Sequence, residues 1–150
     1  MHVLGLAIRY GLPNEADAIA KLVNTDEFPR QTSTRDIARM FSQGSFLVLD
    51  RDDPGDPGIG GLAGSAFLQI HDGRGELTLL SVAGDIDAPN LPQRFIEVAE
   101  MMCVAEGCEA MELKVIERPQ LDAVQRDLGF EPLHGSTTRR DEALRLAKRL

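Results

Sequence analysis

Residues 84–95, GDIDAPNLPQRF, connect the apolar run LTLLSV to a long helical pattern, FIEVAEMMCVAE. A strand, a short loop and the beginning of a helix often form a phosphate-binding site, because the first amides of a helix carry N–H groups without partners inside the helix. This loop contains two aspartates and two prolines, and it has no glycine after Gly84. Its chemistry therefore differs from that of a glycine-rich phosphate loop.

The cysteines and histidines do not have the spacing of a metal site. Cys103 and Cys108 are the two cysteines, and His2, His71 and His134 are scattered along the chain. Two thiols give neither a disulfide framework nor enough ligands for a structural zinc ion. We therefore predict two reduced, partly buried cysteines and no metal.

The size and charge of the chain limit the classes of function. The 150 residues have the length of one domain, residues 1–150, and the hydrophobic fraction of 43% is typical of a soluble globular protein. The net charge of −8 argues against a nucleic-acid partner, since such binding depends on neutralising phosphates. No apolar run approaches the roughly 20 residues that span a bilayer. The amino terminus also lacks the features of a signal peptide. We expect a cytoplasmic protein without a membrane partner. A homodimer is one possible state of assembly.

The first part of the chain combines one strand with two helices. VLGLAIRY predicts a strand, and a helix follows that Pro13 opens and Asn14 caps. Ile37 and Met40 lie at helical spacing in a second helix, for which Gly44 is a natural end.

The middle of the chain predicts an antiparallel meander followed by a helix and a parallel strand. Three strand patterns joined by short turns are SFLVLD, IGGLAGSAFLQI and ELTLLSV. A helix is predicted from about Leu91 to Glu106, buried through Phe95, Val98, Ala99 and Met102 and ended by Gly107. AMELKVI follows this crossover, so we expect it to lie parallel to ELTLLSV. ERPQLDAVQRDLGF then predicts a short helix.

In this order the elements resemble the GCN5-related N-acetyltransferase (GNAT) family. IRYGLPNEADAIAKLV looks like the first strand and helix of the family, and QRDLGFEPL looks like its closing Gly-Phe signature. The resemblance covers essentially the whole chain. It implies an α/β (α+β) domain with a central, mostly antiparallel mixed sheet of about seven strands, flanked by about four helices. The ending Lys148-Arg149-Leu150 is similar to the final strand of the family, and this favours a strand for the tail over the helix that EALRLAKRL predicts locally.

The resemblance also places a site for acetyl-coenzyme A (acetyl-CoA) at the loop. The family's strand before this loop ends in hydrophobic-x-Val, and its loop glycines hold the pyrophosphate through backbone amides at the start of a helix. Counting from that strand end, proline replaces one glycine and offers no N–H, and aspartate replaces the usual basic or polar residue. The cofactor-binding positions implied in this way are Leu80, Ser81, Val82, Asp87, Ala88, Asn90 and Pro92.

The catalytic role implied by the resemblance belongs to Glu76. It lies six residues before Val82, where the histone-acetyltransferase branch has its general base, and its carboxylate could accept an amine proton through water. The tyrosine that serves the family as general acid is replaced by Gln125, and Tyr10 is the only tyrosine. His71 is a second candidate base. The alternative for Glu76 is a solvated glutamate after a turn.

Three functions are compatible with these residues. The first is an acyl-CoA-dependent N-acyltransferase, which transfers an acetyl group to a small-molecule or peptide amine. The second is a non-catalytic binding or regulatory module that keeps the GNAT-like fold but has lost acetyl-CoA binding, so that the loop is only a well-capped helix start. It is motivated by the acidic, glycine-poor sequence of the loop. The third is binding of another ligand, most suitably a cation, in the same cleft.

Overall fold

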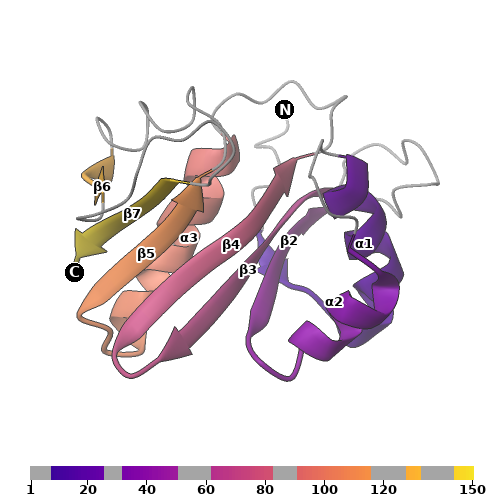
Figure 1. Cartoon of the computed structure of the whole chain (residues 1–150), viewed down its shortest axis with the longest axis horizontal. Helices are drawn as coiled ribbons and strands as arrows, with labels where there is room; N and C mark the ends of the chain where they lie inside the picture. The colour runs from indigo at the N-terminus through magenta and orange to yellow at the C-terminus, as the bar shows by residue number, and fades with distance from the viewer. Residues whose placement is uncertain (1–7, 26–31, 51–61, 83–90, 116–127, 133–143) are drawn as a thin grey trace.

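The computed structural model describes residues 8–25, 32–50, 62–82, 91–115, 128–132 and 144–150 (Figure 1). The polar stretch at 26–31, the Pro-Gly turn at 51–58 and the loop at 83–90 lie outside these ranges. So does nearly all of the short helix expected at 117–130.

A sheet of seven strands forms the centre of the described structure, in the order β1-β2-β3-β4-β5-β7-β6. Its members are β1 (Arg9–Tyr10), β2 (Ser45–Asp50), β3 (Leu62–His71), β4 (Arg74–Val82), β5 (Ala110–Val115), β6 (Glu131–Pro132) and β7 (Leu144–Arg149). Neighbouring strands are antiparallel except β4 and β5, which are parallel. The predictions of a mostly antiparallel mixed sheet and of a parallel strand after the crossover are therefore confirmed.

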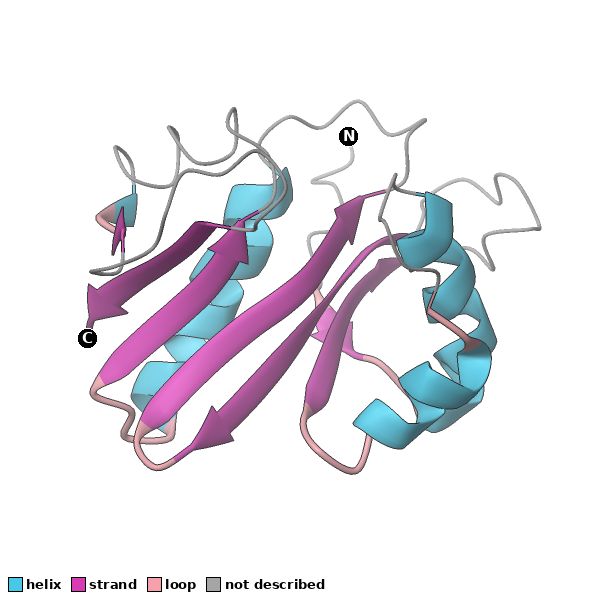
Figure 2. Ribbon diagram, in the orientation of Figure 1, coloured by secondary structure: helices cyan, strands magenta, loops and turns pink. Residues whose placement is uncertain are grey.

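Helices cover both faces of this sheet (Figure 2). They are α1 (Ala16–Thr25), α2 (Thr34–Met40) and α3 (Leu91–Ala105), and a 3-10 turn, η1 (Pro13–Glu15), precedes α1. The alternating side chains of β2 show the two layers. Phe46 and Val48 belong to the cluster beneath α1 and α2, whereas Leu47 and Leu49 belong to the cluster beneath α3. We call these clusters the α1–α2 core and the α3 core. None of the helices in the described ranges is long and apolar enough to cross a membrane.

The helix α3 follows from the spacing of its apolar residues. Leu91, Phe95, Ala99 and Cys103 recur every fourth residue and are buried on one stripe. The helix ends at Ala105, and Gly107 in the turn that follows has a φ of 80°, the left-handed conformation typical of a helix terminus. Two residues that were also expected to be buried, Val98 and Met102, are only half-buried, because they flank the buried stripe.

The beginning of the first helix differs from the sequence-based expectation. Asn14 was expected to cap it, but Asn14 lies inside η1, which begins at Pro13. The backbone N–H of Glu15 donates to the carbonyl oxygen of Leu12 at 2.8 Å, and the N–H of Leu12 donates to Oε1 of Glu15 at 2.9 Å. A glutamate that reaches back thus takes the role expected of asparagine. The reason is that proline starts a helical turn without needing a partner for an N–H group.

The tail forms the strand that the family resemblance favours. In β7, Leu146 is fully buried and lies opposite Leu113 of β5. Pairing with β5 satisfies the backbone groups of the tail, and the α3 core takes up its apolar side chain. Tertiary pairing therefore overrides the local helix propensity of EALRLAKRL.

Candidate functional site

The parallel strands β4 and β5 pair only along their first residues. Its register ends at Leu77 and Leu113. Beyond that point β4 continues beside β3 to Val82, whereas β5 continues beside β7 to Val115. In Figure 1 the arrowheads of β4 and β5 lie at the same edge of the sheet. The sheet therefore opens between these two strands toward their carboxyl ends.

A β-bulge lies in β4 directly after the parallel pairing ends. Ser65 of β3 pairs with Ser81, and Phe67 pairs with Thr78, so that β4 has one more residue than β3 over this stretch. A bulge bends its strand and increases the local twist. The bulge accounts for the separation of β4 from β5, and it leaves the backbone of β4 beyond Leu77 outside the ladder with β5.

The helix α3 begins at the open end of this strand pair. Its last turn lies at the other end, because the N–H of Glu109, just after the helix, donates to the carbonyl oxygen of Gly73 at 2.8 Å, beside the beginning of β4. At its first turn Leu91 is buried in the α3 core, followed by Phe95. The positive end of the helix dipole therefore lies near the carboxyl ends of β4 and β5.

This geometry suits an elongated ligand with an anionic end. A strand edge that leaves its neighbour can hydrogen-bond an extended chain of amides. The amino terminus of a helix favours phosphate through its N–H groups and its dipole. The two features adjoin here, and the described residues contain no cluster of ligands for a metal ion.

No protein-family model matches this sequence, and no curated protein matches it. Solved structures do resemble it. Rv2747 from Mycobacterium tuberculosis, in complex with CoA, has 12% identity and a TM-score of 0.73, over 95% of this chain and 98% of that chain. The ribosomal-protein-alanine N-acetyltransferase from Brucella melitensis has 14% identity and a TM-score of 0.73, over 95% and 99%. An acetyltransferase of the GNAT family from Streptococcus pneumoniae has 12% identity and a TM-score of 0.70, over 95% and 98%. This chain has the GNAT fold.

Within the GNAT fold, four of the predicted site residues lie on β4. Glu76 lies in the part paired with β5, and Leu80, Ser81 and Val82 lie beyond it. The side chains of Leu80 and Val82 are partly buried against the α3 core, and Ser81 is 1% exposed. A ligand between the strands would therefore meet the backbone of these residues rather than their side-chain ends.

Of the predicted phosphate-binding residues, only Pro92 lies within the described residues. Asp87, Ala88 and Asn90 lie outside the described residues. Pro92 is the second residue of α3 and is half-buried. Its place in the first helical turn agrees with the preference of proline for that position, and it gives this end of the GNAT fold one N–H donor fewer.

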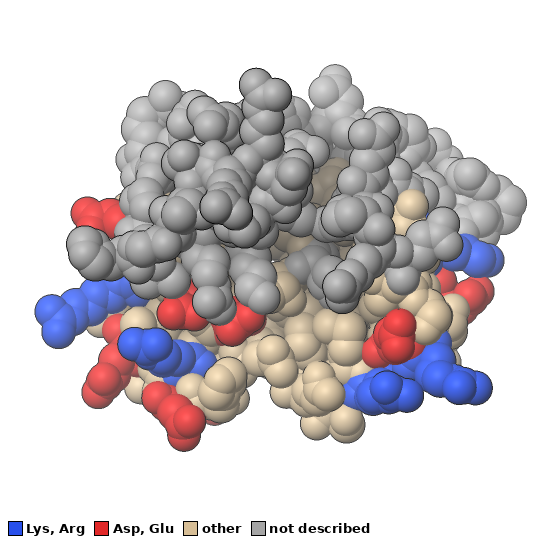
Figure 3. Space-filling view, viewed as in Figure 1, with Lys and Arg blue, Asp and Glu red and all other residues tan. Residues whose placement is uncertain are grey.

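Glu76 lies beside a second glutamate, which the sequence-based reasoning did not select. Its Cα partners are Gln69 of β3 and Glu112 of β5. Nη1 of Arg74 lies 3.6 Å from Oε1 of Glu112. Both glutamates are half-buried, and Figure 3 shows acidic and basic side chains beside one another on this side of the molecule. The sequence did contain a signal for Glu112. AMELKVI alternates apolar and charged residues, and its expected parallel pairing with ELTLLSV would have placed Glu112 near Glu76.

The face of the sheet that carries Glu76 is the one opposite α3. Its neighbour Leu77 is buried in the α3 core, and Gly75 lies directly against Sγ of Cys103 of α3. Since alternate residues of a strand point to opposite faces, the Glu76 side chain points away from α3. The Glu76 side chain therefore lies on the face of the sheet on which α1 and α2 lie.

A buried serine near the bulge was also missed. Ser65 is fully buried, and its Oγ is the one buried side-chain polar atom of the described residues without a hydrogen-bond partner. It lies opposite Ser81 on β4 and Val48 on β2. The only sequence signal is a hydroxyl inside the apolar run LAGSAFL, a weak one because buried serines commonly bond to the backbone.

The other reactive side chains lie away from the opening. Tyr10 is at the end of β1, near the last turn of α3 and so at the end of that helix opposite Pro92. Both cysteines are free and buried, as expected. Burial, the charge and hydrogen bond of Cys108, and the charge of Glu100 raise the pKa of the Cys103 thiol to about 12. Cys103 is therefore protonated at neutral pH and is a poor nucleophile.

Proposed function

We propose that this protein is an N-acetyltransferase that transfers the acetyl group of acetyl-CoA to an amine, with residues 1–150 as one catalytic domain. The observation that carries this proposal is the opening between β4 and β5 beside the first turn of α3. Its support comes from structures of the same fold, one of them in complex with CoA and others named as acetyltransferases.

The described residues fit the elongated part of acetyl-CoA. The backbone of β4 at Leu80–Val82 lies outside the ladder with β5, so it offers an edge to the amides of the pantetheine arm. The first turn of α3 would face the pyrophosphate, with one N–H donor fewer because of Pro92. Asp87, Ala88 and Asn90 are proposed to line the same end. When bound, acetyl-CoA supplies the activated thioester.

Glu76 is proposed to accept the proton of the incoming amine through a water molecule. Its carboxylate is half-buried, and Glu112 lies next to it. Because two neighbouring carboxylates repel each other, the contact of Arg74 with Glu112 relieves part of this repulsion. The negative charge of the pair would also attract a protonated amine from solvent.

The class of amine is proposed from the structural relatives. The Brucella melitensis protein and a relative from Escherichia coli are ribosomal-protein-alanine N-acetyltransferases, so a peptide with an amino-terminal alanine is a reasoned first substrate. Small primary amines form the second group for assay. The carboxylates of Glu76 and Glu112 suit either class, because both are cationic at neutral pH.

Two measurements test this function. Isothermal titration with acetyl-CoA should give saturable binding that desulfo-CoA competes away. Incubation with acetyl-CoA should then release free thiol only when an amine from the panel is present. Absence of acetyl-CoA binding would contradict the proposal and favour the non-catalytic module. Binding without thiol release for every amine would contradict the catalytic role alone.

A further inference from the structure

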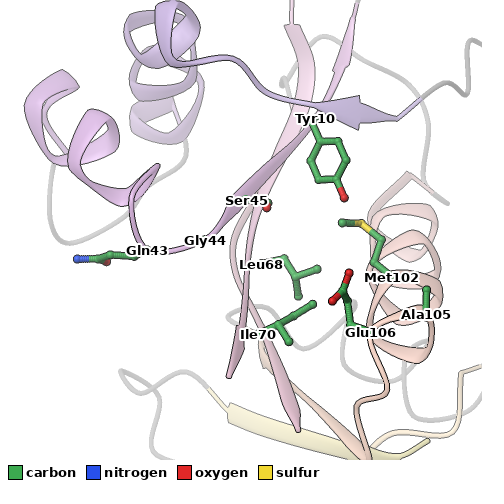
Figure 4. A pocket seen from close by; sticks show the side chains of 9 residues that line it. All are labelled: Tyr10, Gln43, Gly44, Ser45, Leu68, Ile70, Met102, Ala105 and Glu106. Atoms are coloured by element: carbon green, nitrogen blue, oxygen red, sulfur yellow. The ribbon is translucent and has the colours of Figure 1, made fainter. Parts of the chain in front are cut away.

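A cavity lies on the α3 side of the sheet, between the last turn of α3 and strands β1, β2 and β3 (Figure 4). Tyr10 closes it at β1, Leu68 and Ile70 form its floor on β3, and Met102, Ala105 and Glu106 come from the end of α3. Its volume is about 340 Å³. This volume lies at the lower end of the range of roughly 300–1,000 Å³ for small-molecule sites. We call it the α3-end cavity.

Three apolar side chains form much of one part of the α3-end cavity. In Figure 4 the side chains of Leu68, Ile70 and Met102 point into it, whereas that of Gln43 points away. Tyr10 is 59% exposed, and its side chain extends toward Met102 with the hydroxyl end foremost, whereas Ile70 is 37% exposed. A ligand with a hydrocarbon body would find apolar contacts on these side chains.

The polar groups of the cavity are acidic or neutral. The Glu106 carboxylate points into the space in front of Met102. Among the residues that the structure describes, no side chain forms an ion pair with Glu106. The last carbonyl groups of α3 lie at the same end, and they carry the negative pole of the helix dipole. The described lining of the cavity therefore holds one carboxylate and no cation.

The position of Tyr10 adds a second feature that favours a cation. The face of an aromatic ring attracts an ammonium group within about 6 Å of its centroid. The Tyr10 ring and the Glu106 carboxylate come from opposite walls of the cavity, with apolar side chains between them. A ring, a carboxylate and hydrocarbon walls are together complementary to an organic ammonium ion.

We propose that the α3-end cavity binds a small organic cation, a protonated primary amine with a short hydrocarbon or aryl body. The ammonium group would pair with Glu106 and approach the Tyr10 ring, and the hydrocarbon body would cover Leu68, Ile70 and Met102. Such a ligand buries the exposed apolar surface and supplies the missing positive charge at the same time.

This cavity is separate from the opening between β4 and β5. It lies at the last turn of α3, whereas Pro92 and the opening lie at the first turn. Glu76 points to the opposite face of the sheet. Binding in the α3-end cavity is therefore independent of acetyl transfer, and its test uses the protein without acetyl-CoA.

The test is isothermal titration of the full chain with 2-phenylethylammonium, with 2-phenylethanol as the neutral ligand of similar shape. The ammonium ion should bind saturably, and the alcohol about tenfold more weakly, since charge-assisted hydrogen bonds are roughly twice as strong as neutral ones. Glu106→Gln should weaken ammonium binding about tenfold and leave the alcohol nearly unchanged. Glu109→Gln, which removes the same charge at an exposed neighbour outside the cavity, is the matched control and should bind as the natural protein does.

A second variant tests the cavity itself. Ala105→Leu keeps a good helix former but fills part of the space, and it should abolish binding of both ligands. Retained binding in Ala105→Leu would overturn the proposal. So would equal loss in Glu106→Gln and Glu109→Gln, or equal affinity for the ammonium ion and the alcohol. The variant Glu76→Gln should bind 2-phenylethylammonium normally, and loss of binding there would place the ligand at the acetyl-transfer site instead.

Discussion

Gly64 of β3 lies directly against the ring of Phe95: a Cβ atom on Gly64 would stand 2.8 Å from Cε2 of that ring. Phe95 is fully buried in the first turns of α3. The absence of a side chain at Gly64 thus allows the beginning of α3 to approach the strand next to the proposed cofactor site. Two residues far apart in sequence therefore set the position of that helix end.

Gly64→Ala should displace Phe95 and destabilise the fold by about 1–3 kcal/mol, the usual cost of overpacking a core. Urea denaturation measures this change. In a Phe95→Leu background the same substitution should cost less, because the smaller side chain leaves room for the methyl group. An equal cost in both backgrounds would show that the contact with Phe95 is not the cause.

Arg9 joins three parts of the chain, and its removal should change the acid stability. Its guanidinium donates to Asp50 from Nε and Nη2 at 2.8 Å each, and to Glu15 from Nη1 at 2.9 Å and from Nη2 at 2.7 Å. These hydrogen bonds hold the pKa values of Glu15 and Asp50 below their ordinary values of 4.5 and 3.8. Because the pKa values of both carboxylates are lowered in the folded protein, their pairing with Arg9 stabilises the fold above the ordinary pKa values. This stabilisation is lost as the pH falls through the lowered pKa values.

Arg9→Met should therefore lower the free energy of unfolding by about 1–2 kcal/mol at pH 7, a modest value because the pairs are partly solvent-screened. The difference in the free energy of unfolding between Arg9→Met and the natural protein should become smaller as the pH falls from 4.5 to 3. Urea denaturation at a series of pH values measures both effects, with Lys21→Met as the control for an exposed ion pair. A constant difference at all pH values would rule out the carboxylates as its source.

Cys103 should resist alkylation in the folded protein. Its thiol is fully buried and its pKa is raised to about 12 by burial and by Cys108. Iodoacetamide at pH 8 should leave Cys103 unmodified by mass spectrometry until urea unfolds the chain. Since the folded pKa lies above the ordinary value of 9.0, stability should fall as the pH rises from 9 toward 12. Cys103→Ala should remove part of that alkaline loss, and an unchanged pH dependence would assign it to other groups.

Pro92→Ala should strengthen binding of acetyl-CoA. The substitution restores a backbone N–H in the first turn of α3, which faces the proposed pyrophosphate site, and one hydrogen bond contributes about 0.5–1.5 kcal/mol. Isothermal titration should therefore show an affinity several-fold higher. Pro13→Ala, at the beginning of η1, is the matched control for replacing a helix-start proline. If Pro92→Ala leaves the affinity unchanged, the pyrophosphate is not held at this helix end.

Glu76→Gln should lower kcat by about 10²–10⁴-fold, the usual contribution of a general base. The KM for acetyl-CoA should stay the same, because Glu76 lies before the opening between β4 and β5. Glu112→Gln, which alters the neighbouring carboxylate in the same row of the sheet, should have a much smaller effect on kcat. Equal losses in the two variants would indicate that the pair acts through its charge rather than through proton transfer by Glu76.

Local sequence patterns predicted most of the fold because each one has a local physical cause. The apolar run SFLVLD became β2, and the four-residue spacing from Leu91 to Cys103 became α3. The turn between β3 and β4 was predicted from HDGRG, and Asp72 and Gly73 there have φ values of 52° and 74°. At Asn14 the local reasoning was wrong, because it did not foresee that Glu15 would reach back to the N–H of Leu12.

The sequence by itself determined the order of the described elements and the crossover that makes β5 parallel to β4. These follow from residue periodicity, from turn residues and from the resemblance to a family, all of which are properties of contiguous segments. Only the tertiary structure decided where β4 and β5 separate, that Glu76 adjoins Glu112, that Gly64 meets Phe95, and that Tyr10 and Glu106 face one cavity. These relationships depend on strand register and on the approach of α3 to the sheet. Such long-range packing is a collective minimum of the whole chain, and no single segment encodes it.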